Sequence, residues 1–192
     1  MNNPNQRSEL LMGSEAMEKL KNSTVMVVGT GGVGSFAAEA LIRTGVGNLI
    51  LIDKDVVEPS NINRQLVARR DTIGQIKVEV LKKHAANLNP DIQVTAIHDF
   101  YYASMNEKLK ALRPDYILDC IDSVDSKKDR ILFALDNDIP IISSMGMARK
   151  KDPGQISVME LEKTSYDPIA KILRIWKRKN KIRKKIQVVS ST

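Results

Sequence analysis

Cysteine is nearly absent from this chain of 192 residues, which contains only Cys120. One cysteine excludes an intrachain disulfide and any zinc site built from several cysteines. Aromatic residues make up 4% of the sequence, and no apolar run approaches the length of a membrane span. Residues 1–5 are polar and lack the basic-then-apolar order of a signal peptide. We therefore expect a cytoplasmic protein with no membrane contact.

The positive charge is concentrated at one end of the chain. The formal net charge is +7, but residues 168–192 hold nine basic residues and no acidic ones, which leaves −2 for the rest. Apolar residues at 169, 172, 173 and 176 predict a helix with a basic opposite face. A solvated helix face is the plain interpretation. With no acidic residues to form ion pairs along the helix, the pattern favours a polyanion contact through Lys171, Arg174, Lys177, Arg178 and Lys181.

A glycine-rich stretch near the start of the chain is the strongest local signal. The β-branched run 24–28 predicts a buried parallel strand, and residues 35–43 predict a helix that packs through Phe36, Ala40 and Leu41. Between them lie Gly29, Gly31, Gly32 and Gly34. A glycine turn before a helix lets backbone N–H groups approach a phosphate, although close helix–strand packing also requires small residues there.

The segments after the loop repeat the strand–helix alternation. Strands are predicted at 49–53, 92–97, 116–122, 140–146 and 154–161. Helices are predicted at 74–88, through Ile73, Ile76, Val80 and Leu88, and around 105–112 and 131–135. A short helix capped by Ser14 is expected in the leader. The pattern predicts an α/β fold with a Rossmann-like, open, mostly parallel sheet covered by helices on both faces. We expect one domain over 1–192, with a leader (1–22), a nucleotide-binding core (23–150) and a basic C-terminal helix–strand segment (151–192).

Polar residues follow the predicted strands. Asp53 ends the second strand at the separation from the glycine loop where an acid can hold a ribose. The polar loop 54–65 then departs from the dehydrogenase pattern. Arg64 in this loop and Lys77 after it are either cations of the phosphate site or surface charges, and for each residue taken singly the pattern favours a surface charge. Asp122 is either a Mg²⁺ ligand or a cap on the next helix. Cys120 is expected to pack as a small apolar residue.

Five motifs in order resemble the ThiF/MoeB/ubiquitin-activating superfamily, whose members adenylate a carboxylate with ATP and Mg²⁺. They are residues 27–34, Asp53 with Asp55, residues 60–65, residues 74–77 and residues 119–123. Within it, residues 6–13, 121–124, 152–156, 166–170 and 186–192 are most similar to the branch of tRNA threonylcarbamoyladenosine dehydratases.

The resemblance implies a role for each matching position. The glycine loop, Asp53, Asp55 and Ser123 would hold the nucleotide, and Asp122 would bind Mg²⁺. Asn61, Arg64, Gln65 and Lys77 would surround the phosphates, and Arg7 would reach the site of the partner subunit in a homodimer. The carboxylate on tRNA adenosine 37 would be adenylated and then closed by the carbamoyl nitrogen to a hydantoin. The implied partner is tRNA, with no DNA, and a sulfur-transfer protein is a further candidate.

Two departures from the superfamily pattern bear on the choice of activity. The paired zinc-binding cysteines of many sulfur-carrier-activating relatives are missing, and no cysteine follows Cys120 to form a thioester. Both weaken the alternative of an adenylyltransferase that activates a ubiquitin-like sulfur carrier. The sequence is also compatible with a non-catalytic protein that binds nucleotide and RNA, and less so with a nicotinamide dehydrogenase. Family members usually continue beyond residues 188–192, so we expect the chain to be short at its carboxyl end.

Overall fold

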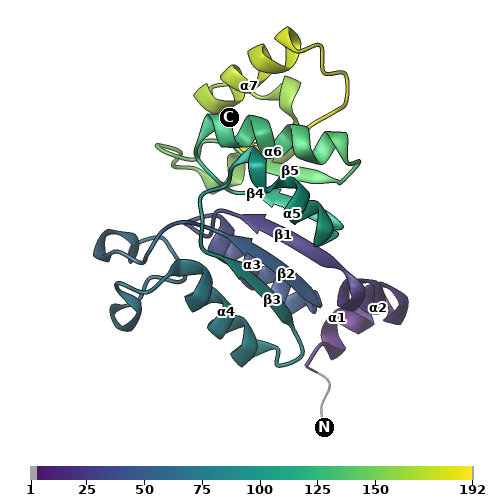
Figure 1. The fold of residues 1–192 in the computed structure, drawn as a ribbon, viewed down its shortest axis with the longest axis vertical. Helices are drawn as coiled ribbons and strands as arrows, with labels where there is room; N and C mark the ends of the chain where they lie inside the picture. The colour runs from purple at the N-terminus through teal and green to yellow at the C-terminus, as the bar shows by residue number, and fades with distance from the viewer. Residues whose placement is uncertain (1–3, 192) are drawn as a thin grey trace.

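The computed structural model describes residues 4–191, and one seven-stranded sheet organises it (Figure 1). The strands stand in the order β3-β2-β1-β4-β5-β7-β6, and β6 runs antiparallel to β7 while the other neighbours are parallel. Predictions for positions 1–3 and 192 lie outside the described residues. The strands are β1 (Thr24–Val28), β2 (Asn48–Ile52), β3 (Gln93–Ile97), β4 (Tyr116–Asp119), β5 (Ile141–Ser144), β6 (Ile156–Glu160) and β7 (Gln187–Ser191).

Helices cover both faces of this sheet, as the apolar runs of the strands require. Side chains of α3 (Gly34–Thr44) and α4 (Lys77–Leu88) join the core on one face, which contains Val25 and Val27 of β1. Met26 and Val28 point to the other face, where the core includes residues of α5 (Asn106–Ala111), α6 (Val124–Asp136) and α7 (Pro168–Lys179). The predicted fold class is confirmed: the chain is a Rossmann-like α/β protein.

Different features lie at the edge of the sheet where the parallel strands begin and at the edge where they end. The leader forms α1 (Gln6–Met12) and α2 (Ser14–Asn22), and the Gly47 N–H before β2 donates to the Leu20 carbonyl at 3.1 Å. The leader therefore lies at the amino edge, where the parallel strands begin. At the carboxyl edge, the strand order reverses between β1 and β4. Open α/β sheets bind ligands at such a switch point.

Several local predictions were wrong, for reasons visible in the backbone. The leader has two helices, and Gly13 rather than Ser14 precedes the second. Helix α4 begins at Lys77 because Gly74 has a φ of +84°, which a right-handed helix does not accommodate, and Ile73 is 42% exposed. Strand β4 ends at Asp119, so Asp122 lies in the following loop.

The predicted helix faces also need correction. In α3 the buried side chains Ser35, Ala38 and Ile42 follow helical spacing, which turns Phe36 and Ala40 toward solvent. In α7 the buried residues are Ala170, Leu173 and Lys177, so the assignment of Lys177 to a solvated basic face was wrong. The Lys177 stem packs inward and its ammonium pairs with Glu162.

Candidate nucleotide-binding site

The glycine loop after β1 combines tight packing with an open cradle. A Cβ on Gly34 would lie 1.7 Å from the Gly29 carbonyl oxygen, and one on Gly29 would lie 2.9 Å from the Cys120 carbonyl oxygen. A Cβ on Gly31 would meet nothing closer than the Gln65 amide nitrogen, at 3.6 Å. Gly29 and Gly34 therefore bring α3 against the sheet, and Gly29, Gly31 and Gly32 border the cavity described below. The packing interpretation is confirmed at Gly29 and Gly34, and the phosphate-binding interpretation stays a prediction.

Asp53 fixes this loop from the neighbouring strand. Its Oδ2 accepts from the Thr30 N–H at 2.6 Å and from the Thr30 hydroxyl at 2.9 Å. Its Oδ1 accepts from the Asp55 N–H at 2.9 Å. A carboxylate holding three donors keeps the loop and the start of the next connection in register. The role of Asp53 toward a ribose stays a prediction.

A cavity of about 670 Å³ lies at the switch point between β1 and β4. This volume falls within the ordinary range for small-molecule sites. Its wall is formed by the connections after β1, β2, β3, β4 and β5 and by the start of α7. Ten residues predicted from the sequence line it: Gly29, Gly31, Gly32, Asp53, Asp55, Arg64, Gln65, Lys77, Asp122 and Ser123.

The two predicted phosphate-binding cations differ in setting. Lys77 opens α4, its side chain is 4% exposed, and its ammonium donates to Asp55 Oδ2 at 2.8 Å. Arg64 is exposed, and its Nη1 donates to the Ser60 carbonyl and the Asn63 side-chain oxygen, both at 2.8 Å. Lys77 is thus a fixed charge in the cavity wall, and Arg64 reaches it from the polar loop.

Three predicted residues are not among those lining the cavity. Gly34 is buried under the glycine loop. Asn61 is 6% exposed and accepts from the Glu58 N–H at 3.2 Å, so it holds the short 3-10 turn Pro59–Asn61. Arg7 is exposed in α1 at the amino edge, away from the cavity of its own chain.

A buried polar cluster next to the cavity was missed from the sequence. Asp119 Oδ2 accepts from the Lys127 ammonium at 3.0 Å and from the Ser143 hydroxyl at 2.6 Å, and both charged side chains are fully buried. The pair ties β4, β5 and α6 together just before the loop that carries Asp122. The sequence indicated this cluster only through Asp119, an aspartate at the end of an apolar strand. A lysine in a predicted helix, such as Lys127, is ordinarily expected to face solvent.

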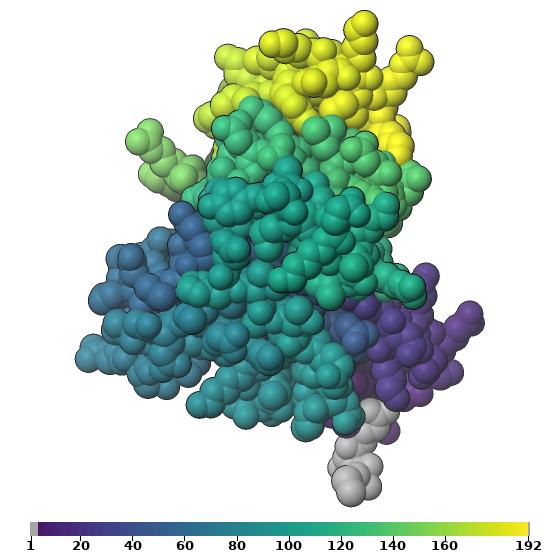
Figure 2. Space-filling model, viewed as in Figure 1, coloured from purple at the N-terminus to yellow at the C-terminus, as the bar shows by residue number. Residues whose placement is uncertain are grey.

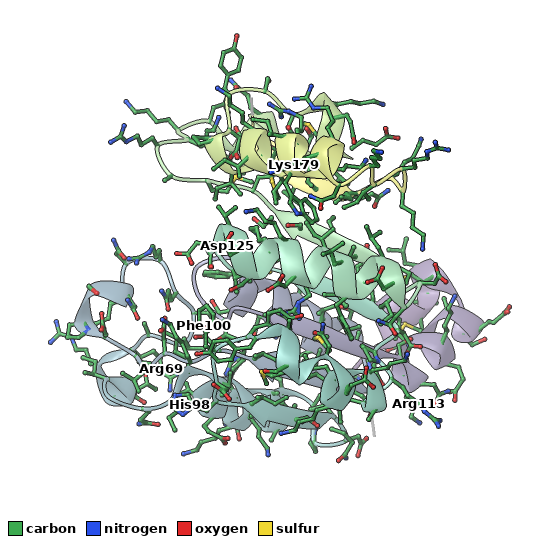
Figure 3. All side chains as sticks on the ribbon, turned by 45° about the horizontal axis from the view of Figure 1, so that its top comes forward. Arg69, His98, Phe100, Arg113, Asp125 and Lys179 are labelled. Atoms are coloured by element: carbon green, nitrogen blue, oxygen red, sulfur yellow. The ribbon has the colours of Figure 1, made fainter. Side chains whose placement is uncertain are left out.

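Aromatic residues after β3 form another part of the wall that sequence reasoning missed. Phe100 and Tyr101 line the cavity, and the Lys54 ammonium lies 5.1 Å from the Phe100 ring centre. The buried Arg130 guanidinium lies 3.4 Å from the Tyr101 ring centre, and burial lowers its pKa to about 10. Figure 3 shows Phe100 on the side of Arg69 and Asp125, with Arg113, which precedes β4, on the opposite side.

Cys120 also borders the cavity, but its chemistry is that of a packed side chain. Burial raises the pKa of its thiol to about 12, and the Asp119 carboxylate next to it adds to the shift. A thiol with that pKa is not a nucleophile at neutral pH. This agrees with the packing role expected from the sequence.

A second cavity, of about 780 Å³, lies at the amino edge between the leader helices and the starts of β2 and β3. It is larger, but the glycine loop and the cations are elsewhere, and parallel sheets bind ligands at their carboxyl edge. We therefore assign the nucleotide site to the cavity at the switch point.

Within residues 4–191, no three His, Cys, Asp or Glu side chains gather as a metal site. Nor does any helix in that range have the length and apolar character to cross a membrane.

Comparisons with known proteins agree with this geometry. The ThiF family model matches residues 5–185. The chain is 47% identical to tRNA threonylcarbamoyladenosine dehydratase of Bacillus subtilis, over 96% of this chain and 73% of that protein. It is 41% identical to the Escherichia coli protein of the same name, over 85% of this chain and 61% of that protein. A crystal structure of the Escherichia coli dehydratase in complex with ATP superposes with a TM-score of 0.93 at 36% identity, over 98% of this chain and 81% of that one.

Proposed function

The chain belongs to the ThiF family, and we propose that it is an ATP-dependent tRNA threonylcarbamoyladenosine dehydratase. The observation that carries this proposal is the cavity at the switch point, which joins the glycine loop to Lys77, Arg64 and Asp122. The fold matches over 98% of this chain and 81% of a dehydratase whose crystal structure is a complex with ATP. The product is the cyclic, hydantoin form of the modified adenosine.

The first step is adenylation. The threonylcarbamoyl carboxylate attacks the α-phosphate, one P–O bond forms, and the bond to the leaving pyrophosphate breaks. Backbone N–H groups at Gly31 and Gly32 approach the phosphates, and the helix that follows adds its partial positive charge. Lys77 and Arg64 offset the charge that develops on the phosphate oxygens. Because Lys77 is already held by Asp55, little reorganisation is needed when that charge appears.

The second step is cyclisation. The carbamoyl nitrogen attacks the activated carbonyl, a C–N bond forms, the C–O bond to AMP breaks, and the nitrogen loses its proton. The nucleophile and the carbonyl belong to one molecule, so positioning supplies much of the rate and no cysteine nucleophile is required. The protonated, buried thiol of Cys120 is consistent with that chemistry.

We further propose a Mg²⁺ ion, a homodimer and a cytoplasmic location. Mg²⁺ is commonly held by one or two carboxylates together with substrate phosphates, and Asp122 is an exposed carboxylate bordering the cavity. When bound, the ion would neutralise phosphate charge. The exposed position of Arg7 at the amino edge supports a role toward the site of a partner subunit. A cytoplasmic location is consistent with tRNA as the substrate.

The substrate class can be tested by measuring AMP formation with two candidate acceptors. A dehydratase releases AMP and pyrophosphate from ATP only when tRNA carrying threonylcarbamoyladenosine is present. The alternative, activation of a ubiquitin-like sulfur carrier, predicts pyrophosphate exchange that depends on a small protein ending in Gly-Gly. Exchange with that protein and none with modified tRNA would replace the proposed function with the alternative. Binding of nucleotide and RNA without turnover would indicate a non-catalytic protein.

A further inference from the structure

Most of the basic stretch 168–192 lies far from the mouth of the cavity. Helix α7 begins beside the cavity, where Ile169 is part of the wall. Twelve residues later it ends at the other edge of the sheet, about 18 Å away at the usual helical rise. There Lys184 donates to the Leu135 carbonyl at 2.6 Å, in the last turn of α6. Figure 1 shows the yellow loop after α7 on the side of α1 and α2.

Two of the predicted tRNA-binding side chains in that segment are engaged within the protein. Lys177 is 6% exposed and pairs with Glu162. Arg174 is half-buried, and its Nη1 donates to the Thr164 carbonyl at 2.8 Å. Lys171, Arg178 and Lys181 remain exposed. Lys171 is in the first turn of α7, near the cavity, whereas Arg178 is in the last turn and Lys181 follows it. Arg178 and Lys181 are therefore remote from the nucleotides around the reacting base.

The connection between β5 and β6 carries cations directly at the cavity mouth. Gly146, Met147 and Ala148 form part of the wall, and the next residues are Arg149, Lys150 and Lys151. Figures 1 and 2 show this light-green connection projecting from the body of the molecule, on the side of the loops that precede α4. It is therefore at the carboxyl edge, with the glycine loop and the polar loop.

Lys150 anchors this connection to the sheet, whereas the side chains of Arg149 and Lys151 are exposed to solvent. The Lys150 ammonium donates to the Ser191 carbonyl at the end of β7 at 2.9 Å. Arg149 and Lys151 are exposed, and within residues 4–191 neither forms an ion pair with a carboxylate. The adjacent Asp152 accepts from the Gly154 N–H at 2.9 Å and from the Gln155 amide at 3.0 Å, so it caps its own turn.

The backbone of Arg149 restricts which residues can replace it. Its φ is +66°, in the left-handed region that favours glycine. Arg113, Asp138, Tyr166 and Lys181 also have a positive φ, so this conformation by itself does not mark a binding site. Here the Lys150 anchor on one side and the cavity wall on the other hold the connection in place.

We propose that Arg149 and Lys151 bind backbone phosphates of the tRNA strand that flanks the reacting adenosine, an inference that rests on the proposed function. For the carboxylate to reach the α-phosphate, the modified base must leave the stack and enter the cavity. Enzymes that act on a base commonly extrude it in this way, which leaves the phosphates of its neighbours at the mouth of the pocket. Arg149 and Lys151 are the cations that immediately follow the wall on that side.

The test compares three double variants that each remove two positive charges. The rim variant is Arg149→Asn with Lys151→Gln, since asparagine tolerates the left-handed backbone. The C-terminal variant is Arg178→Gln with Lys181→Asn, since Lys181 also has a left-handed backbone, with a φ of +54°. The matched control is Lys108→Gln with Lys110→Gln, which removes two exposed lysines from α5. For each protein, the Kd for modified tRNA is measured by filter binding at several salt concentrations, alongside the Kd for ATP and the melting temperature.

We expect the rim variant to bind modified tRNA about tenfold more weakly and to lose about 1.5 from the slope of log K against log salt, because two single-strand phosphate contacts disappear. Its Kd for ATP and its melting temperature should match those of the unchanged protein, and the C-terminal variant should lose less tRNA affinity. If the unchanged protein dehydrates modified tRNA and the rim variant binds it as tightly as the control does, the rim contact is wrong and the proposed function stands. If the unchanged protein neither binds nor converts modified tRNA, both are wrong.

Discussion

The Lys77 ammonium donates to Asp55 Oδ2 at 2.8 Å across the wall of the cavity, joining the first turn of α4 to the connection after β2. The lysine side chain is 4% exposed and the aspartate side chain 50% exposed. The pair is therefore open to solvent on the aspartate side, and we expect its contribution to the free energy of folding to be small. Its main effect is to fix the position of one positive charge. Lys77 should then be required for adenylation but not for the fold.

Replacing Lys77 tests this distinction. We expect Lys77→Met to lower kcat/KM for modified tRNA by about 100-fold or more, the usual loss when a donor to developing charge is removed. Lys77→Arg, which keeps the charge but not its shape, should recover part of the activity. The melting temperature of Lys77→Met should stay close to that of the unchanged protein. A large loss of stability with little loss of activity per folded molecule would contradict the assignment.

The two kinds of glycine in the loop should respond differently to the same substitution. Gly34→Ala places a Cβ 1.7 Å from the Gly29 carbonyl oxygen, so we expect a loss of more than about 3 kcal/mol of folding free energy. Gly31→Ala finds its nearest neighbour at 3.6 Å, and the variant should fold normally. Its methyl group occupies the side from which a phosphate would approach, so its Kd for ATP should rise. Chemical denaturation and calorimetric ATP titration measure the two effects, and normal ATP binding by folded Gly31→Ala would contradict a cradle at this glycine.

The thiol of Cys120 offers a test of the cysteine-independent mechanism. With its pKa raised to about 12 by burial, the reactive thiolate is scarce at neutral pH and increases as pH rises toward that value. At pH 8 we expect about one thiolate in ten thousand thiols, and alkylation by iodoacetamide should be far slower in the folded protein than after denaturation. The labelling rate of folded protein should increase about tenfold per pH unit. Rapid labelling that levels off between pH 8 and 9 would show an ordinary or activated thiol instead.

The sequence predicted the architecture and part of the cavity wall because both depend in part on local patterns. Apolar runs predicted the strands, and Asp53 and Asp122 were expected at one edge because parallel strands end together. Asp55, Gln65 and Ser123 were expected there only because the family resemblance implied it. Ten predicted residues do meet there. The pattern could not place Lys127, whose charge is neutralised by Asp119 from a neighbouring strand. It also could not place Lys177, because Glu162, which pairs with it, lies on a different segment. In both cases the partner that makes burial of the charge possible is distant in sequence.

The rim cations were missed for a related reason. Nine basic residues close together near the end of the chain give a stronger signal in sequence than two at Arg149 and Lys151. The direction of α7 across the sheet decides which of these groups lies near the cavity, and that direction is a property of the fold. Charge density along a chain is therefore a weaker guide to a substrate contact than charge placed at the mouth of a site.

The most direct test of the central claim is mass spectrometry of tRNA nucleosides after incubation with the protein and ATP. We predict that threonylcarbamoyladenosine loses the mass of one water, that AMP forms in equal amount, and that Lys77→Met slows both together. Omitting ATP or supplying unmodified tRNA should abolish the change. An unchanged nucleoside mass, obtained with folded protein that binds both ATP and modified tRNA, would contradict the account.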